Sequence, residues 1–322
     1  MEKMNKLLKS VALCICISLQ SCAQNKNEIK NDTTNMEKIE YQKEGLEFSL
    51  KYRHKNCSYE ILVNDMPVIT HFGIGERSGL TVYINQYILK AGKQDITIRM
   101  FPAKSDENSF KELLDENSGV SIEVAKKKAP ISPLDELNAE SKGETIKWEV
   151  LNYTTPKIEK PTSHIEFKTS FVVDSKDINW KITGWSKSKD LRNDPNLRKE
   201  VETFYDDYKK VLEEGNQAKY LSLVNTTIYE QAASTPWDKE AETQIKKEMG
   251  NYATEKRNFL YPCKNAELKY FGNGKVVTLV CTDIQTFGYS PLISKTAKNM
   301  MPKAHTFYLH KPEGSNKLEI IR

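Results

Sequence analysis

The 322-residue sequence predicts an α+β fold, with an N-terminal antiparallel β-sandwich over residues 45–190 and a domain of helices followed by an antiparallel sheet over residues 191–322. Two observations carry this prediction. Short apolar runs alternate with polar residues and turn signals through the first region, which is typical of a sandwich. Beyond residue 194 the apolar spacing becomes helical, and strand patterns return afterwards, which is an α+β order.

The first region is expected to consist mainly of short strands. Leu46, Phe48 and Leu50 alternate with polar residues, and Ala91–Lys93 is one of the turns between runs. A short helix is expected at Phe110–Leu114. The expected strands cover residues 46–51, 59–63, 68–72, 80–84, 95–100 and 120–124.

A Lys- and Pro-containing stretch, 126–142, is interpreted as a connector. Strand patterns then return, and they either complete the sheets of the first domain or form a small sheet that bridges the two halves. Trp180 and Trp185 stand five apart in one expected strand, so they should lie on opposite faces. These later strands are expected at 146–153, 164–173 and 178–185.

Helical spacing starts after Asp194, a good N-cap residue, and Pro195, a good first helical residue. This helix is expected to end at Gly215, and two more are expected over 216–233 and 237–258. The remaining strands are expected at 266–271, 276–286, 306–310 and 318–321, with Asn-Gly in the turn at 272–275.

This order of elements over residues 194–322 resembles the NTF2-like and cystatin-like plan, in which helices pack on a curved sheet. The resemblance rests on element order. NTF2-like folds host both enzymes and pure binding modules, so it does not choose between those functions.

Residues 1–21 are typical of a signal peptide: Lys3, Lys6 and Lys9 precede a short apolar run that ends at Leu19. The run is well short of the ~20 apolar residues that a membrane-spanning helix needs. Leu19-Gln20-Ser21-Cys22 resembles the lipobox of bacterial lipoproteins. The resemblance implies lipid transfer to the Cys22 sulfur, cleavage before Cys22 and fatty acylation, for example with palmitate, of the new amine. The alternatives are an ordinary secretory signal or an apolar first helix of a cytosolic protein.

Residues 22–44 are rich in Asn, Lys, Glu and Thr and are predicted to be a disordered tether. Residue 24 is Gln, whereas Asp at that position favours inner-membrane retention of lipoproteins. By this resemblance the protein is expected to be lipid-anchored in the cell envelope at the outer membrane, on either its periplasmic or its exposed side.

The formal net charge is +4, and removal of residues 1–21, with three Lys and one Glu, leaves +2. Near-balanced charge without a basic block does not suggest a nucleic-acid partner. Cys57, Cys263 and Cys281 remain beyond Cys22. Cys263 and Cys281 flank one predicted hairpin and are the best candidates for a disulfide, the alternative being two buried thiols. Their spacing indicates neither a zinc site nor a redox motif.

We find no sequence pattern for a catalytic site, a metal site or a cofactor. The histidines lack metal-ligand spacing, and no G-x-S-x-G elbow is present. Gly73–Ser78 opens no helix and is interpreted as a flexible hairpin loop. Asp206 and Asp207 are adjacent on a helix and should not converge. The five histidines are His54, His71, His164, His305 and His310.

One long excursion between two expected strands carries Phe287, Tyr289, Met300 and Met301. Long loops are often functional, so these residues are a candidate binding loop, the alternative being a lid over the sheet. The sequence therefore favours a non-catalytic binding lipoprotein for a protein, peptide or glycan, one version being an immunity-type lipoprotein. The alternatives are an envelope enzyme with a pocket in the C-terminal domain and a structural or assembly lipoprotein.

Overall fold

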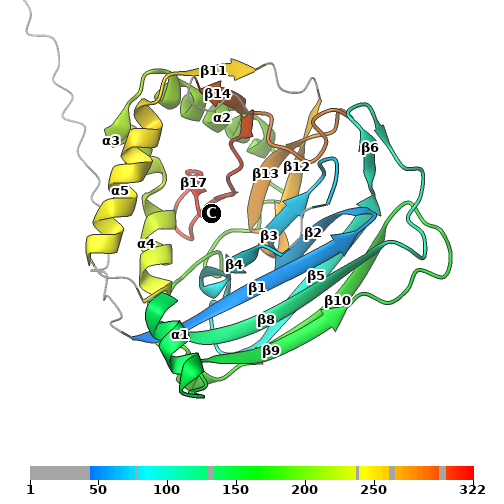
Figure 1. Cartoon of the computed structure of the whole chain (residues 1–322). Helices are drawn as coiled ribbons and strands as arrows, with labels where there is room; N and C mark the ends of the chain where they lie inside the picture. The colour runs from blue at the N-terminus through cyan, green and yellow to red at the C-terminus, as the bar shows by residue number, and fades with distance from the viewer. Residues whose placement is uncertain (1–43, 77–78, 130–132, 237–238, 261–264, 297–301) are drawn as a thin grey trace, which may run out of the picture. The chain divides into compact units, whose positions relative to one another are not determined.

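The computed structural model describes residues 44–76, 79–129, 133–236, 239–260, 265–296 and 302–322. These residues form five α-helices and several antiparallel sheets, so the predicted α+β class is confirmed. In Figure 1 the long strands of the first half run side by side, and the yellow-green helices of the second half lie together at one side of the picture.

Two four-stranded antiparallel sheets account for most of the first half. The first has the order β4-β1-β8-β9, with β1 Gly45–Lys55, β4 Thr81–Tyr83, β8 Gly119–Ala129 and β9 Lys147–Thr154. The second has the order β10-β5-β2-β3, with β2 Cys57–Val63, β3 Met66–His71, β5 Gly92–Pro102 and β10 Ile165–Val173. The predictions that residues 146–153 and 164–173 complete the sheets of the first region are confirmed.

Side chains of both sheets meet in one hydrophobic cluster. Phe48 and Leu50 on β1 and Ile61 on β2 are fully buried in it. This follows from the alternation in the sequence, because every second side chain of a strand points to the same face. The cluster also contains Phe271 and Ile321, so the two halves of the chain share part of their core.

Two expectations for residues 109–142 were wrong. The expected helix at Phe110–Leu114 rested on only three apolar residues, too few to establish a period. In the structure Ser109–Phe110 is the short strand β7, which pairs with β6 at Lys104–Asp106. The connector at 126–142 instead continues β8 to Ala129 and then forms helix α1, Pro133–Ser141.

The segment 178–185 forms turns and irregular backbone instead of a strand. Trp180 and Trp185 are consequently both 5% exposed in the same hydrophobic cluster, and the expectation of opposite faces was wrong. Trp180 donates its indole N–H to the Ile88 carbonyl at 3.1 Å, which satisfies its one buried donor.

Four helices open the second half: α2 Leu197–Glu213, α3 Gln217–Leu223, α4 Asn225–Ser234 and α5 Lys239–Thr254. The expected second helix is divided at Val224, whose φ and ψ of −97° and 5° leave the helical region. Helix α2 begins after Asn196 rather than after Asp194. The Asp194 carboxylate instead accepts the Asn196 N–H at 3.0 Å and pairs with Lys311 at 2.6 Å.

Two further sheets follow the helices. The order β12-β13-β16-β17 joins Ala266–Phe271, Val276–Cys281, Leu309–His310 and Glu319–Ile320. The order β11-β14-β15 joins Arg257–Leu260, Ile293–Thr296 and Lys303–Ala304. Apolar side chains of α2 and of β13 and β16 form a second hydrophobic cluster, so α2 packs against this sheet region.

The predicted hairpin between β12 and β13 is confirmed. Gly272, Asn273 and Gly274 have φ values of 58°, 58° and 86°, a region that Gly and Asn adopt most readily. Strand β13 ends at Cys281, five residues before its expected end, and part of the expected excursion pairs as β14 with β11. No helix in the described part of the chain is long and apolar enough to cross a membrane.

Candidate binding cleft

Two adjoining cavities of about 770 and 710 Å³ lie between α2 and strand β11. Both are lined by Glu213, Arg257 and Asn258, so they form one continuous depression, called here the β11 cleft. Cavities of this size are typical of sites for small molecules or short peptides.

Charged residues of α2 form one wall of the cleft. They recur every three or four positions and so share one helix face. Arg198 pairs with Glu202 at 2.5 Å, and Lys209 pairs with Glu213 at 3.4 Å. Asp206 lies between these pairs and has no ion-pair partner among the described residues.

The neighbouring carboxylate, Asp207, lines a different cavity of about 470 Å³ on another side of α2. The sequence-based expectation that Asp206 and Asp207 do not converge is therefore confirmed. A general acid–base pair made from these two carboxylates is excluded by their positions.

The cleft floor is largely apolar and aromatic, with Tyr205, Phe259, Leu279 and Leu292. The Tyr205 hydroxyl lies 3.1 Å from Thr278 Oγ1 and accepts the Leu279 N–H at 3.2 Å. Burial raises the pKa of Tyr205, so this phenol stays neutral. Mixed charge above an apolar floor suits a ligand that has both apolar and charged groups.

Arg257 connects the cleft with a polar network behind it. Its guanidinium lies 4.3 Å from the centre of the Tyr252 ring, and its Nε donates to the Glu255 carbonyl at 3.2 Å. Another guanidinium nitrogen donates to the Tyr252 carbonyl. These contacts hold the start of β11 against the end of α5.

The network behind the cleft joins Ser294, His305 and Tyr252. His305 Nε2 lies 2.7 Å from Ser294 Oγ, and His305 Nδ1 lies 3.0 Å from the Tyr252 hydroxyl. Burial, with smaller effects from the Arg257 and Lys303 charges, lowers the pKa of His305 from 6.5 to about 4. At neutral pH the imidazole is therefore uncharged.

A serine within hydrogen-bonding distance of a neutral histidine is the arrangement of an activated nucleophile. Here, however, Ser294 is 2% exposed and His305 is 5% exposed, and neither lines any of the three cavities. A substrate in the cleft would not reach the Ser294 hydroxyl, so we interpret the network as a satisfied polar core. Sequence analysis missed it because the three residues are far apart along the chain.

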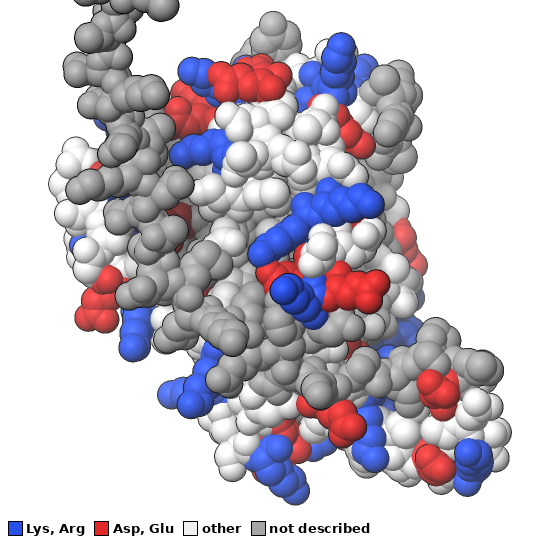
Figure 2. Space-filling view, turned by 90° about the vertical axis from the view of Figure 1, so that its left-hand side faces the viewer, with Lys and Arg blue, Asp and Glu red and all other residues white. Residues whose placement is uncertain are grey.

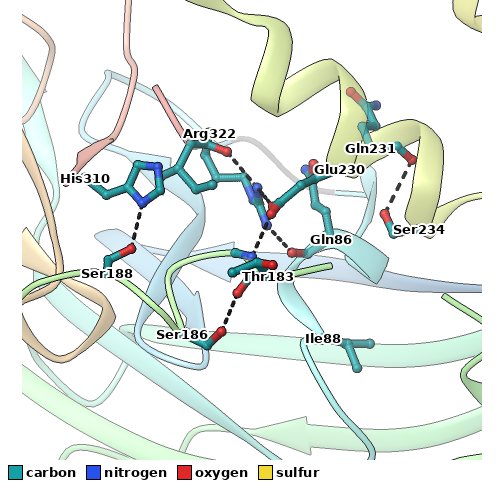
Figure 3. Close-up of polar contacts among 12 residues, drawn as sticks. Gln86, Ile88, Thr183, Ser186, Ser188, Glu230, Gln231, Ser234, His310 and Arg322 are labelled. Carbon is teal, nitrogen blue, oxygen red and sulfur yellow. Dashed lines mark hydrogen bonds and ion pairs between the residues drawn. The ribbon is translucent and has the colours of Figure 1, made fainter. Parts of the chain in front are cut away.

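A second buried network surrounds Arg322 and is drawn in Figure 3. Arg322 Nη1 lies 2.5 Å from Glu230 Oε2, and the two side chains are 3% and 4% exposed. Glu230 Oε1 accepts the Gly184 N–H at 2.6 Å, and Arg322 also donates to the Gln86 carbonyl. The network thus joins α4 and the last residue to segments of the first half.

His310 lies near this network, and its Nδ1 is 2.6 Å from the Ser188 hydroxyl (Figure 3). Burial, followed by the Arg322 charge, lowers the pKa of His310 from 6.5 to about 4. No group of three or more His, Cys, Asp or Glu in the described part of the chain could hold a metal ion.

The predicted binding loop is only partly described. The Phe287 ring packs against Phe72 and Phe110, with ring centres 5.3 and 5.5 Å away. Tyr289 is 36% exposed beside this aromatic cluster. Met300 and Met301 lie outside the described residues. The described part of the loop therefore bridges the two halves of the chain and leaves one tyrosine exposed.

The cysteine predictions can be followed only in part. Cys281 is disulfide-bonded, and Cys57 is a buried free thiol whose pKa burial raises to about 12. Cys22 and Cys263 lie outside the described residues, so lipidation of Cys22 and pairing of Cys263 with Cys281 stay predictions.

Basic and acidic side chains are interspersed on the face of the molecule shown in Figure 2, which gives no extensive surface of one sign. No family model, curated protein or solved structure matches this chain.

Proposed function

We propose that the protein is a non-catalytic binding module of the bacterial envelope, held on a membrane by lipid on Cys22, with the β11 cleft as its ligand site. The observation that carries this proposal is the cleft itself: about 770 and 710 Å³ of adjoining space with an apolar floor and charged walls. Ligand sites commonly combine an apolar lining with a few placed polar groups.

Binding is favoured over catalysis by the position of the reactive groups. The serine–histidine pair Ser294–His305 is buried behind the cleft, and four of the charged groups on the α2 wall are paired with each other. Arg198–Glu202 and Lys209–Glu213 use their charges within α2. Such a wall can orient a ligand, but it does not supply a nucleophile and a base.

The location in the envelope is supported by Leu19-Gln20-Ser21-Cys22 and by the polar residues that follow. Two acyl chains give stable anchoring where one does not. We also propose the finer fold: the two sheets that share one core correspond to a β-sandwich, and the helices with the later sheets correspond to an NTF2-like arrangement. The partner is a protein, a peptide or a glycan.

Capture of partners from native membranes tests the ligand site. We expect wild-type protein to retain a specific partner and Asn258→Trp to lose it, because Asn258 is exposed and lines both cavities. Asn251→Trp is the matched control, since Asn251 is exposed on α5 and lines none of the three cavities. Equal capture by both variants would exclude the cleft as the ligand site.

Metabolic labelling with an alkyne fatty acid tests the anchor separately. Wild-type protein should incorporate the label and Cys22→Ala should not, whereas Cys16→Ala should label normally because Cys16 precedes the proposed cleavage position. Label that persists in Cys22→Ala would refute the lipobox assignment without affecting the cleft.

A further inference from the structure

The geometry of β11 indicates which chemical class the cleft takes. In a strand, successive side chains point to opposite faces of the sheet. All four residues of β11, Arg257 to Leu260, nevertheless line the same cavity of about 770 Å³. A single cavity contacts four consecutive strand residues when it runs along the edge of the strand, so this cavity follows the backbone of β11. The adjoining cavity of about 710 Å³ also reaches Lys295 and Thr296 of β14.

Strand β11 lies at the edge of its sheet in the part of the chain that the structure describes. Strand β11 is the first strand in the order β11-β14-β15 and pairs on one side, with β14. Among the described residues, no backbone or side-chain group is hydrogen-bonded to the other side of β11. An edge with unpaired N–H and C=O groups is a template for one more strand.

We infer that the β11 cleft binds an extended peptide, which adds to the edge of β11 as a further strand; this inference rests on the proposed binding function. Peptide recognition by strand addition uses main-chain hydrogen bonds for affinity and alternate side-chain contacts for specificity. Four residues of β11 span roughly 13 Å at about 3.3 Å per residue. The segment of the peptide that pairs with this edge is therefore about four or five residues long.

Charge and polarity define the side chains of this peptide. One face of an added strand would meet Phe259, Leu279 and Leu292, which favours Val, Ile or Leu. The other alternate side chains would meet the α2 wall. In the α2 wall, Asp206 has no ion-pair partner among the described residues. Its negative charge favours Lys or Arg at the central position of the peptide.

The probe is a pool of acetylated, amidated pentapeptides with Lys at position 3, Thr or Ser at positions 1 and 5, and Val, Ile or Leu at positions 2 and 4. It is offered to the full chain purified from membranes in detergent. We expect saturable binding by fluorescence anisotropy, together with slower amide hydrogen exchange confined to the segment that contains β11.

N-methylation of the peptide backbone distinguishes strand addition from other modes. Only alternate peptide amides face the edge of a neighbouring strand. Methylation of one alternate set should therefore abolish binding, while methylation of the other set should leave the affinity within about twofold. Equal binding of both methylated pools, absence of binding by the unmethylated pool, or protection away from β11 would each overturn the inference.

Asp206→Asn should weaken binding of the Lys-containing pool about threefold, as expected for an exposed ion pair. The matched control is Asp207→Asn, which should leave the affinity unchanged. Asp207 is also exposed, but it lines the separate cavity of about 470 Å³. If the peptide pools do not bind but Asn258→Trp still abolishes partner capture, the inference of strand addition is wrong and the cleft remains the proposed ligand site.

Discussion

Two of the buried polar networks among the described residues differ in charge and in how far they reach along the sequence. The Arg322 network is ionic and joins α4 to Gln86 and Gly184 in the first half. The His305 network is uncharged and stays within the second half, behind the β11 cleft. A buried charge is costly unless it is paired, so loss of either partner of the first network would leave an uncompensated charge between the halves. The second network satisfies the buried polar groups behind the β11 cleft without placing a charge there.

The largest effect should come from breaking the ionic network. Glu230→Gln leaves the Arg322 guanidinium buried without its carboxylate, which typically costs roughly 3–5 kcal/mol of unfolding free energy. Urea denaturation followed by circular dichroism measures it. Arg198→Gln, at an exposed ion pair, is the control and should cost less than about 1 kcal/mol. Similar losses in the two variants would mean that the Arg322 network does not bear on stability.

Acid should destabilise the fold through His305 and His310. Their folded-state pKa values of about 4 lie below the unfolded value of 6.5, so the unfolded chain binds more protons between these pH values. The stabilisation is present above pH 6.5 and is lost as the pH falls to about 4. Each histidine should account for roughly 3 kcal/mol of this loss.

Thermal unfolding of wild type and His305→Phe across this pH range measures the contribution of one histidine. The variant should show a shallower pH dependence, and His164→Ala, at an exposed histidine, should match wild type. An unchanged slope in His305→Phe would show that His305 does not titrate with folding.

A smaller effect is expected for Ser294→Ala, which removes the hydroxyl 2.7 Å from His305 Nε2. An unsatisfied buried polar group costs about 1–3 kcal/mol, and relaxation of the site should place this variant near the lower figure. Partner capture should be unchanged, as measured by quantitative pull-down. If wild-type protein has an enzymatic activity that a stably folded Ser294→Ala variant lacks, the His305 network is catalytic and not only structural.

Much of the local structure was predictable, because it depends on short-range patterns. The Asn-Gly turn at 272–275, strand β12 at its expected bounds and the long helix α2 all follow from neighbouring residues. Errors fell where local signals were short or conflicting. The Phe110–Leu114 helix was predicted from three apolar residues, and the 178–185 strand from a pattern that the packing of Trp180 and Trp185 overrode.

The candidate site was much less predictable. The candidate binding loop was predicted at Phe287, Tyr289, Met300 and Met301. In the structure Phe287 packs in an aromatic cluster against the first half, and the two methionines lie outside the described residues. The β11 cleft was not expected, because the segment after α5 was assigned to the end of a helix. No periodic signal in four residues reveals a strand whose pairing partner, β14, begins more than 30 residues later.

The sequence by itself determined the α+β class and the order of most elements. It also contains Leu19-Gln20-Ser21-Cys22, the motif on which the proposed envelope location rests. These depend on hydrophobic period, turn residues and a short motif, all of which act over a few neighbouring positions. Only the tertiary structure decided that Glu230 meets Arg322, that Ser294 and His305 are buried, and that β11 has an open edge beside α2. The physical reason is that these contacts join residues far apart in the chain, and packing of the whole core sets which of them meet.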